Sequence, residues 1–123
     1  MARFYLVDDS LFVLTQLRQI LQKGGHEVCG SAQNGDAALQ YLEEYADTID
    51  VITLDITMPG PDGIETLRRI RARWPEKVCI VVSGLAKRDL VLEARALGAA
   101  GYIIKPLSRD AVMERLAEIL PPS

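Results

Sequence analysis

Short apolar runs alternate with segments of helical periodicity along the whole sequence, and this alternation limits the possible folds more than any other feature. Several runs are nearly unbroken stretches of β-branched residues, as expected for strands that are covered on both faces. The runs span Arg3–Val7, Glu27–Ser31, Asp50–Leu54, Lys77–Val82 and Ala100–Ile104. Each is followed by apolar residues spaced three or four positions apart, the spacing of an amphipathic helix.

Strand–helix units joined by short connections predict a parallel sheet with helices on both faces. We therefore expect an α/β fold, a flavodoxin-like (βα)5 doubly wound sandwich with five parallel strands in the order 2-1-3-4-5. The sequence has no linker, internal repeat or low-complexity segment. Residues 1–123 are thus expected to form a single domain, with no separate output domain.

The composition is that of a soluble globular protein, with 49% apolar and 25% charged residues. The chain has 14 Lys and Arg against 17 Asp and Glu, a net charge of −3, whereas whole-domain nucleic-acid binding requires a basic face. No apolar run approaches the ~20 residues of a membrane span, and no signal peptide is recognisable at the start. We expect a cytoplasmic protein that binds neither membranes nor nucleic acid.

The two cysteines, Cys29 and Cys79, match no metal-binding or redox spacing. In the predicted strand order they lie three strand spacings apart, ~14 Å, which is too far for a disulfide. Both are predicted to be free thiols, packed as small buried hydrophobes.

Polar side chains follow four of the predicted strands, at the sheet edge where ligands bind in open parallel sheets. Asp8 and Asp9 follow the first strand and Asp55 follows the third. Ser83 follows the fourth and Lys105 the fifth. Two like charges ~4 Å apart repel by ~4 kcal/mol at an effective dielectric of ~20, so three carboxylates need a cation besides Lys105. An all-oxygen site selects a hard ion, Mg²⁺ or alternatively Mn²⁺.

This set of groups is suited to phosphoryl transfer. A carboxylate beside magnesium, here Asp55, can attack phosphorus and form an aspartyl phosphate. The charge that develops on the phosphoryl oxygens needs a metal, a hydroxyl donor and a cation, and Ser83 and Lys105 can supply the last two.

Each motif also has an ordinary structural explanation when it is taken alone. Asp8-Asp9-Ser10 can cap the first helix, and Met58–Pro61 can be a simple turn. Ser83-Gly84 is a common turn pair, Lys105 can be a solvated lysine, and Tyr102 can pack on the sheet. The convergence of these motifs on one edge of the sheet favours a functional site.

In these motifs the sequence resembles, over essentially its full length, the receiver domain of two-component response regulators. The matching stretches are Asp8-Asp9, Asp55-x-x-Met58-Pro59-x-x-Asp62-Gly63, Ser83-Gly84, Gly98-Ala99-x-x-Tyr102 and Lys105-Pro106. The resemblance implies that Asp55 accepts a phosphoryl group from a histidine kinase. It also implies that Asp9, Asp55 and the backbone carbonyl of Thr57 bind Mg²⁺ directly, and that Asp8 holds the ion through water.

The same resemblance implies a conformational switch. Ser83 would bond one phosphoryl oxygen and Lys105 would pair with another, while Tyr102 would rotate to report the state of Ser83. The bond before Pro106 is expected to be cis. Phosphorylation would then change the surface formed by the fourth helix, the fifth strand and the fifth helix. Such a protein is a signalling switch rather than an enzyme, since it catalyses only its own phosphorylation and dephosphorylation.

Among receivers, the stretches Leu54–Pro59 and Gly98–Pro106 are most similar to stand-alone chemotaxis (CheY-like) regulators. The implied partners are a histidine kinase and an output protein, for which the flagellar motor switch is one candidate. Receivers that dimerise to bind DNA usually carry acidic residues just before the switch aromatic. This chain has Ala100-Gly101 there, so a monomer is expected.

Three alternatives remain open from the sequence. The chain can be the receiver fragment of a multidomain transcriptional regulator. It can be a phosphatase of the haloacid dehalogenase type, although that family has Asp where Thr57 stands, two residues after the nucleophile. It can also be a flavodoxin-type flavin binder, although Asp8-Asp9 would repel a flavin phosphate.

Overall fold

The computed structural model describes residues 1–57, 63–85 and 87–120, and the strands in these ranges form one parallel sheet in the order β2-β1-β3-β4-β5. The strands are β1 Arg3–Val7, β2 Glu27–Ala32, β3 Val51–Leu54, β4 Val78–Ser83 and β5 Gly101–Ile104. The helices are α1 Leu11–Lys23, α2 Gly35–Tyr45, α3 Gly63–Arg73, α4 Arg88–Ala96 and α5 Arg109–Ile119, with a 3₁₀ turn η1 at Ala46–Thr48. This arrangement confirms the predicted flavodoxin-like fold and strand order.

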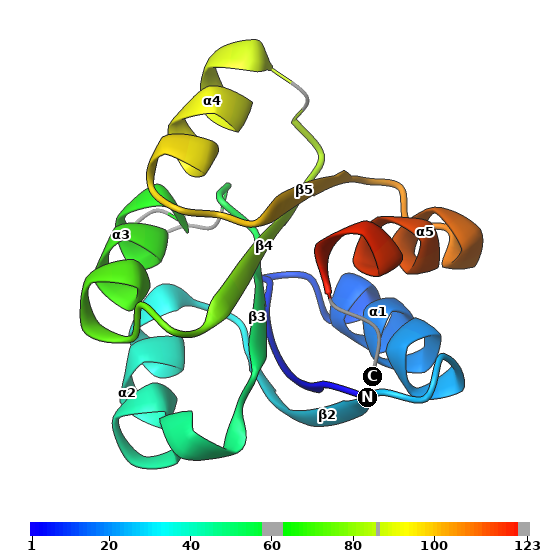
Figure 1. Ribbon diagram of the computed structural model, residues 1–123, viewed down its shortest axis with the longest axis horizontal. Helices are drawn as coiled ribbons and strands as arrows, with labels where there is room; N and C mark the ends of the chain where they lie inside the picture. The colour runs from blue at the N-terminus through cyan, green and yellow to red at the C-terminus, as the bar shows by residue number, and fades with distance from the viewer. Residues whose placement is uncertain (58–62, 86, 121–123) are drawn as a thin grey trace.

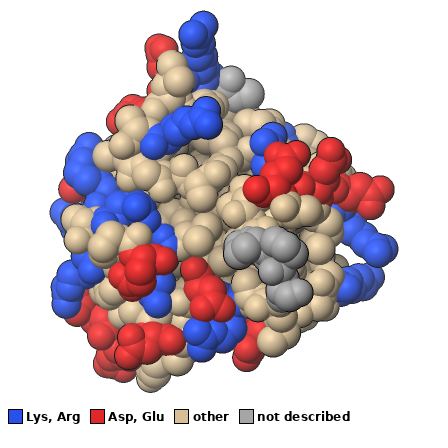
Figure 2. All heavy atoms as spheres, viewed as in Figure 1, with Lys and Arg blue, Asp and Glu red and all other residues tan. Residues whose placement is uncertain are grey.

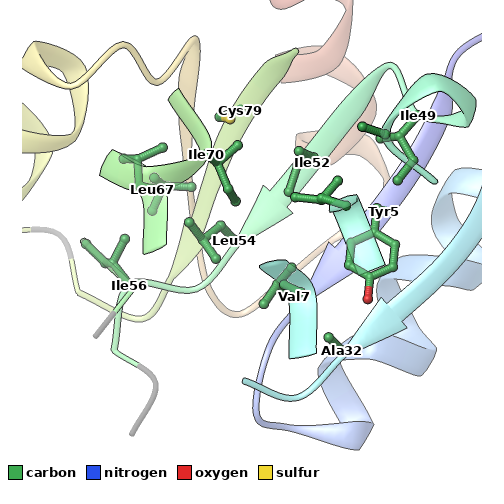
Figure 3. Close-up of a cluster of buried hydrophobic side chains, with 14 of the residues drawn as sticks. Tyr5, Val7, Ala32, Ile49, Ile52, Leu54, Ile56, Leu67, Ile70 and Cys79 are labelled. Carbon is green, nitrogen blue, oxygen red and sulfur yellow. The ribbon is translucent and has the colours of Figure 1, made fainter. Parts of the chain in front are cut away.

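Helices cover both faces of the sheet (Figure 1): α2, α3 and α4 lie on one face, and α1 and α5 on the other. Along β1 the side chains alternate between the two apolar layers. Phe4 and Leu6 pack with α1 and α5, whereas Tyr5 and Val7 belong to the opposite layer, which also contains Ile70 of α3 (Figure 3). The burial of both faces explains why the strands read as continuous apolar runs.

The strand boundaries differ from the predicted ones by one residue. β3 begins at Val51 rather than Asp50, and β4 and β5 also begin one residue later than predicted. The Asp50 side chain accepts hydrogen bonds from the backbone N–H of Arg3 at 2.9 Å and from its guanidinium at 2.9 and 3.1 Å. These bonds to Arg3 lower the pKa of Asp50. The side chain of Asp50 therefore ties the start of β3 to the start of β1.

Within the described residues, side-chain caps begin three of the helices. Ser10, Asn34 and Ser108 are the N-cap residues of α1, α2 and α5, and each accepts a hydrogen bond from a backbone N–H in the first turn. The helix-cap explanation for Asp8-Asp9-Ser10 thus applies to Ser10, which leaves the two carboxylates for another role. None of the described helices has the length and apolarity that crossing a bilayer requires.

Cys29 and Cys79 are free thiols, as predicted. Cys79 is 1% exposed, and burial raises its pKa to about 11. Cys29 lies on the edge strand β2 and is only half-buried, so the prediction of burial is correct for one cysteine and wrong for the other. An edge strand has a neighbouring strand on one side only, and most side chains of β2 are partly exposed.

These environments predict unequal thiol reactivity. At pH 8, an aromatic disulfide reagent is expected to modify Cys29 in the native protein and Cys79 only after unfolding, because the reactive thiolate of Cys79 is suppressed by burial. The absorbance of the aromatic thiolate that the reagent releases counts the modified cysteines, and we expect one in buffer and two in urea. Cys29→Ser is the control, and no cysteine of this variant should react in buffer. Two thiols reacting equally fast in buffer would contradict the buried position of Cys79.

Candidate functional site

Three carboxylates meet at the carboxyl end of the sheet. Asp8 follows β1 and Asp55 follows β3, and these neighbouring strands pair in parallel register through Val7 and Leu54. The backbone N–H of Asp55 also donates to the carbonyl of Val7 at 3.0 Å. With Asp9, the two aspartates place one carboxylate oxygen each within 4.8 Å of one another. The topology thus brings together side chains that are far apart in the sequence.

The three carboxylates differ in exposure. Asp8 is 3% exposed and Asp55 is 2% exposed, whereas Asp9 is exposed to solvent. Burial raises the pKa of Asp8 and the charge of Asp55 adds to the rise, against the opposing effect of hydrogen bonds from Lys105 and Ser10. The cluster is therefore a buried negative site with one member open to solvent, and its charge favours the binding of cations.

Lys105 supplies the positive charge inside this cluster. Its Nζ lies 2.9 Å from Oδ2 of Asp8 and 3.1 Å from Oδ2 of Asp55. Burial disfavours the charged ammonium, but the bonds and charges of the two aspartates together outweigh this effect and raise the pKa of Lys105. The Lys105-Pro106 peptide bond is cis, as the resemblance implied. One ammonium stands against three carboxylates, so the site retains net negative charge.

Thr57 bonds to Asp55 through two groups whose contacts were not predicted from the sequence. Its backbone N–H and its hydroxyl both donate to Oδ1 of Asp55, at 2.8 Å and 2.6 Å. The family resemblance implied a role only for the Thr57 carbonyl, as a ligand of Mg²⁺. A hydroxyl two residues after a carboxylate in a turn is the signal that could have suggested this contact, because such residues readily bond locally.

Ser83 and Tyr102 are linked through Leu85, the second residue after β4. The Ser83 side chain is fully buried, and its Oγ accepts the backbone N–H of Leu85 at 3.2 Å. The Tyr102 hydroxyl donates to the carbonyl of Leu85 at 2.7 Å. The backbone N–H of Lys105 donates to the carbonyl of Ser83 at 2.8 Å. The predicted switch residues are therefore linked to each other through one short loop. Met58, Pro59 and Asp62 of the matching motif lie outside the described residues.

The donor set fits a hard divalent cation. The acidic cluster offers carboxylate oxygens and no sulfur or imidazole, which suits Mg²⁺ better than a softer metal. Asp9 is exposed, and this leaves room for the waters that Mg²⁺ keeps when it binds to proteins.

Comparison with known proteins identifies the class. The family described as response regulator receiver domain matches residues 4–117, and the chain belongs to this family. It is therefore a signalling switch of the receiver type found in two-component systems. Membership of this family rules out the phosphatase and flavin-binding alternatives that the sequence left open.

The relatives narrow the class to CheY-like receivers. The chemotaxis protein CheY of Treponema pallidum is 41% identical over 118 residues, which cover 96% of this chain and 82% of that protein. A chain in the crystal structure of the CheX-CheY-BeF3-Mg complex from Borrelia burgdorferi superposes with a TM-score of 0.92 at 35% identity, covering 98% of this chain and 90% of that chain.

A third relative places the same domain within a longer protein. A protein-glutamate methylesterase/protein-glutamine glutaminase of Bacillus licheniformis is 43% identical over 110 residues. The match covers 86% of this chain and 30% of that protein. Receivers similar to this chain thus occur both at CheY length and as part of larger proteins.

Proposed function

We propose that Asp55 accepts a phosphoryl group from a histidine kinase, and that the phosphorylated chain signals to an output protein in the cytoplasm. Asp9, Asp55 and the backbone carbonyl of Thr57 would hold Mg²⁺ directly, and Asp8 would hold it through water. The observation that carries the proposal is the position of Asp55, which is buried within the acidic cluster with Oδ2 3.1 Å from Nζ of Lys105.

The proposed chemistry follows from the charges around Asp55. An Asp55 oxygen attacks the phosphorus of a phosphohistidine, so that an O–P bond forms and the P–N bond breaks with its electron pair on the imidazole nitrogen. Lys105 neutralises charge on the phosphoryl oxygens, and the Ser83 hydroxyl donates to one of them. Magnesium, when bound, supplies the remaining positive charge.

The transfer of the signal to the surface begins at Ser83. When the Ser83 hydroxyl turns toward a phosphoryl oxygen, the loop at Leu85 loses its hydrogen bond to Ser83 Oγ. Tyr102 is bonded to the carbonyl of Leu85, so its hydroxyl follows the loop. A two-state equilibrium that moves from 1:99 to 99:1 requires ~5.5 kcal/mol, which a few charge-assisted hydrogen bonds can supply.

The surface that Tyr102 shares lies between α4, β5 and α5. A hollow of about 360 Å³ is present there in the described part of the chain. It is lined by Val91, Ala94, Arg95, Ala99, Ala100, Gly101, Tyr102, Ile104 and Arg115. In Figure 2 this face is largely uncharged, with Lys and Arg side chains bordering it on the α4 side. The proposed output partner binds here, and the similarity to chemotaxis proteins favours a chemotaxis partner such as the flagellar motor switch.

A second candidate is a receiver that acts within a larger regulator, which is favoured by the match to the much longer methylesterase. The chemistry at Asp55 is the same in both cases. Only the covalent attachment of the output partner differs, so the test of phosphorylation applies to both.

The test is phosphorylation by a small-molecule donor. Incubation with acetyl phosphate and MgCl₂ is expected to add the mass of one phosphoryl group to the intact protein. EDTA should prevent this addition, because the uncompensated carboxylates repel an anionic donor. Intact-mass spectrometry measures the gain, and peptide mapping locates it. An unchanged mass in MgCl₂, or a phosphoryl group on a residue other than Asp55, would refute the proposal.

A further inference from the structure

The two oxygens of the Asp55 carboxylate have different hydrogen-bond partners. Oδ1 accepts two hydrogen bonds from Thr57, from the backbone N–H at 2.8 Å and from Oγ1 at 2.6 Å. Oδ2 accepts one hydrogen bond from Nζ of Lys105 at 3.1 Å. A carboxylate offers two lone pairs on each oxygen. Thr57 thus uses the full accepting capacity of Oδ1, whereas Oδ2 retains a lone pair that no donor in residues 1–57, 63–85 and 87–120 occupies.

The ammonium of Lys105 decides which oxygen each ligand prefers. The ammonium of Lys105 bonds to Oδ2 and repels a divalent cation, which is therefore directed to the other oxygen, Oδ1. An anionic phosphoryl group is attracted by Lys105 and is directed to Oδ2. The oxygen that a cation needs is consequently the one that Thr57 occupies.

The two Thr57 donors differ in their freedom to leave. The N–H is fixed by the peptide plane, whereas Oγ1 moves by rotation about one side-chain bond. Thr57 is exposed to solvent, so a hydroxyl that leaves Oδ1 can bond water instead. The hydrogen bond from Oγ1 to the charged Asp55 carboxylate is stronger than one between neutral groups. Breaking this bond costs free energy, so the hydroxyl lowers the affinity for a cation without preventing its binding.

From these contacts we infer that the Thr57 hydroxyl is a gate on the phospho-acceptor, which competes with Mg²⁺ for Oδ1 of Asp55. Thr57 is a positioning residue in this role: it holds the Asp55 carboxylate in the metal-free protein and has to release Oδ1 before a metal can bind. The inference rests on the proposed function and adds that the Thr57 hydroxyl lowers the affinity of the site for Mg²⁺.

The test compares Thr57→Val with Thr57→Ser in the full chain. Valine keeps the shape and the backbone N–H but removes the hydroxyl, whereas serine keeps the hydroxyl. Mg²⁺ is titrated without any phosphodonor, and binding is followed by the NMR shifts of the backbone amides of Asp9 and Thr57. Thr57→Val is expected to bind Mg²⁺ about fivefold more tightly than the wild type, the factor that corresponds to one net hydrogen bond. Thr57→Ser should stay within about twofold of the wild type.

Phosphorylation by acetyl phosphate provides a second measurement. The Mg²⁺ concentration that gives half the maximal rate should fall by the same factor in Thr57→Val, and urea unfolding in EDTA checks that the variant is folded. Equal or weaker Mg²⁺ binding by Thr57→Val would overturn the gate, and so would a Thr57→Ser variant that matches Thr57→Val. These outcomes leave the proposed function intact, whereas a wild-type protein that binds no Mg²⁺ would overturn both.

Discussion

Asp55→Asn is expected to abolish the gain of a phosphoryl group from acetyl phosphate and magnesium. The amide of asparagine has nearly the shape of the carboxylate but is not a nucleophile toward phosphorus, and it lacks the negative charge that strengthens Mg²⁺ binding. The substitution also removes one of three crowded carboxylates, so the protein should remain folded. Intact-mass spectrometry after incubation should show the unmodified mass alone.

Asp47→Asn is the matched control for this experiment. Asp47 is exposed in the 3₁₀ turn η1, which precedes β3, whereas Asp55 follows the other end of that strand, and the same chemical change at Asp47 should leave phosphorylation unaffected. A phosphoryl group on the Asp55→Asn protein would show that another residue is the acceptor. Loss of phosphorylation in both variants would indicate damage to the protein rather than a role for Asp55.

Gly63→Ala is expected to destabilise the fold by about 2–4 kcal/mol, a large effect for a single methyl group. A Cβ atom at Gly63 would lie 2.1 Å from Cα of Ile56 and 2.3 Å from the carbonyl oxygen of Asp55. Both are backbone atoms, so α3 has to move away from the loop after β3 to relieve the clash. Urea unfolding measures the loss of stability.

Gly84→Ala is the control for the glycine experiment. A Cβ atom at Gly84 would meet nothing within 4 Å, so its free energy of unfolding should stay within about 0.5 kcal/mol of the wild type. A loss below about 1 kcal/mol in Gly63→Ala would show that the approach of α3 to the loop is looser than the structure indicates. The close contact at Gly63 matters for function because the clashing carbonyl belongs to Asp55, and a displaced α3 would move the acceptor.

The strand pattern and the chemistry of the strand ends could be predicted from the sequence. Stretches such as Val51–Leu54 are apolar at every position, a pattern that fits a parallel strand covered on both faces. Once the strand order is known, Asp8 and Asp55 have to lie side by side because they follow neighbouring strands in register. Local periodicity and topology therefore sufficed to place the candidate site.

The strand boundaries and the burial of individual side chains could not be predicted in this way. The backbone of Asp50 bonds to Arg3 and Val78 on the two neighbouring strands, yet β3 begins one residue later, at Val51. Cys29 and Cys79 both follow a valine, and their places on an edge strand and an inner strand leave one half-buried and the other buried. These features depend on what packs against each residue.

The sequence by itself determined which residues could take part in the site, because strand ends and residue types are local properties. The tertiary structure alone decided how those residues share their bonds. Asp8 and Asp9 are adjacent in the chain, yet one is buried against Lys105 and the other is open to solvent. Lys105 likewise bonds to one oxygen of Asp8 and one of Asp55, at 2.9 and 3.1 Å. Such distances are set by the packing of β1, β3 and β5 together, since hydrogen bonds and charge pairs depend on the position of each atom and not on the order of residues along the chain.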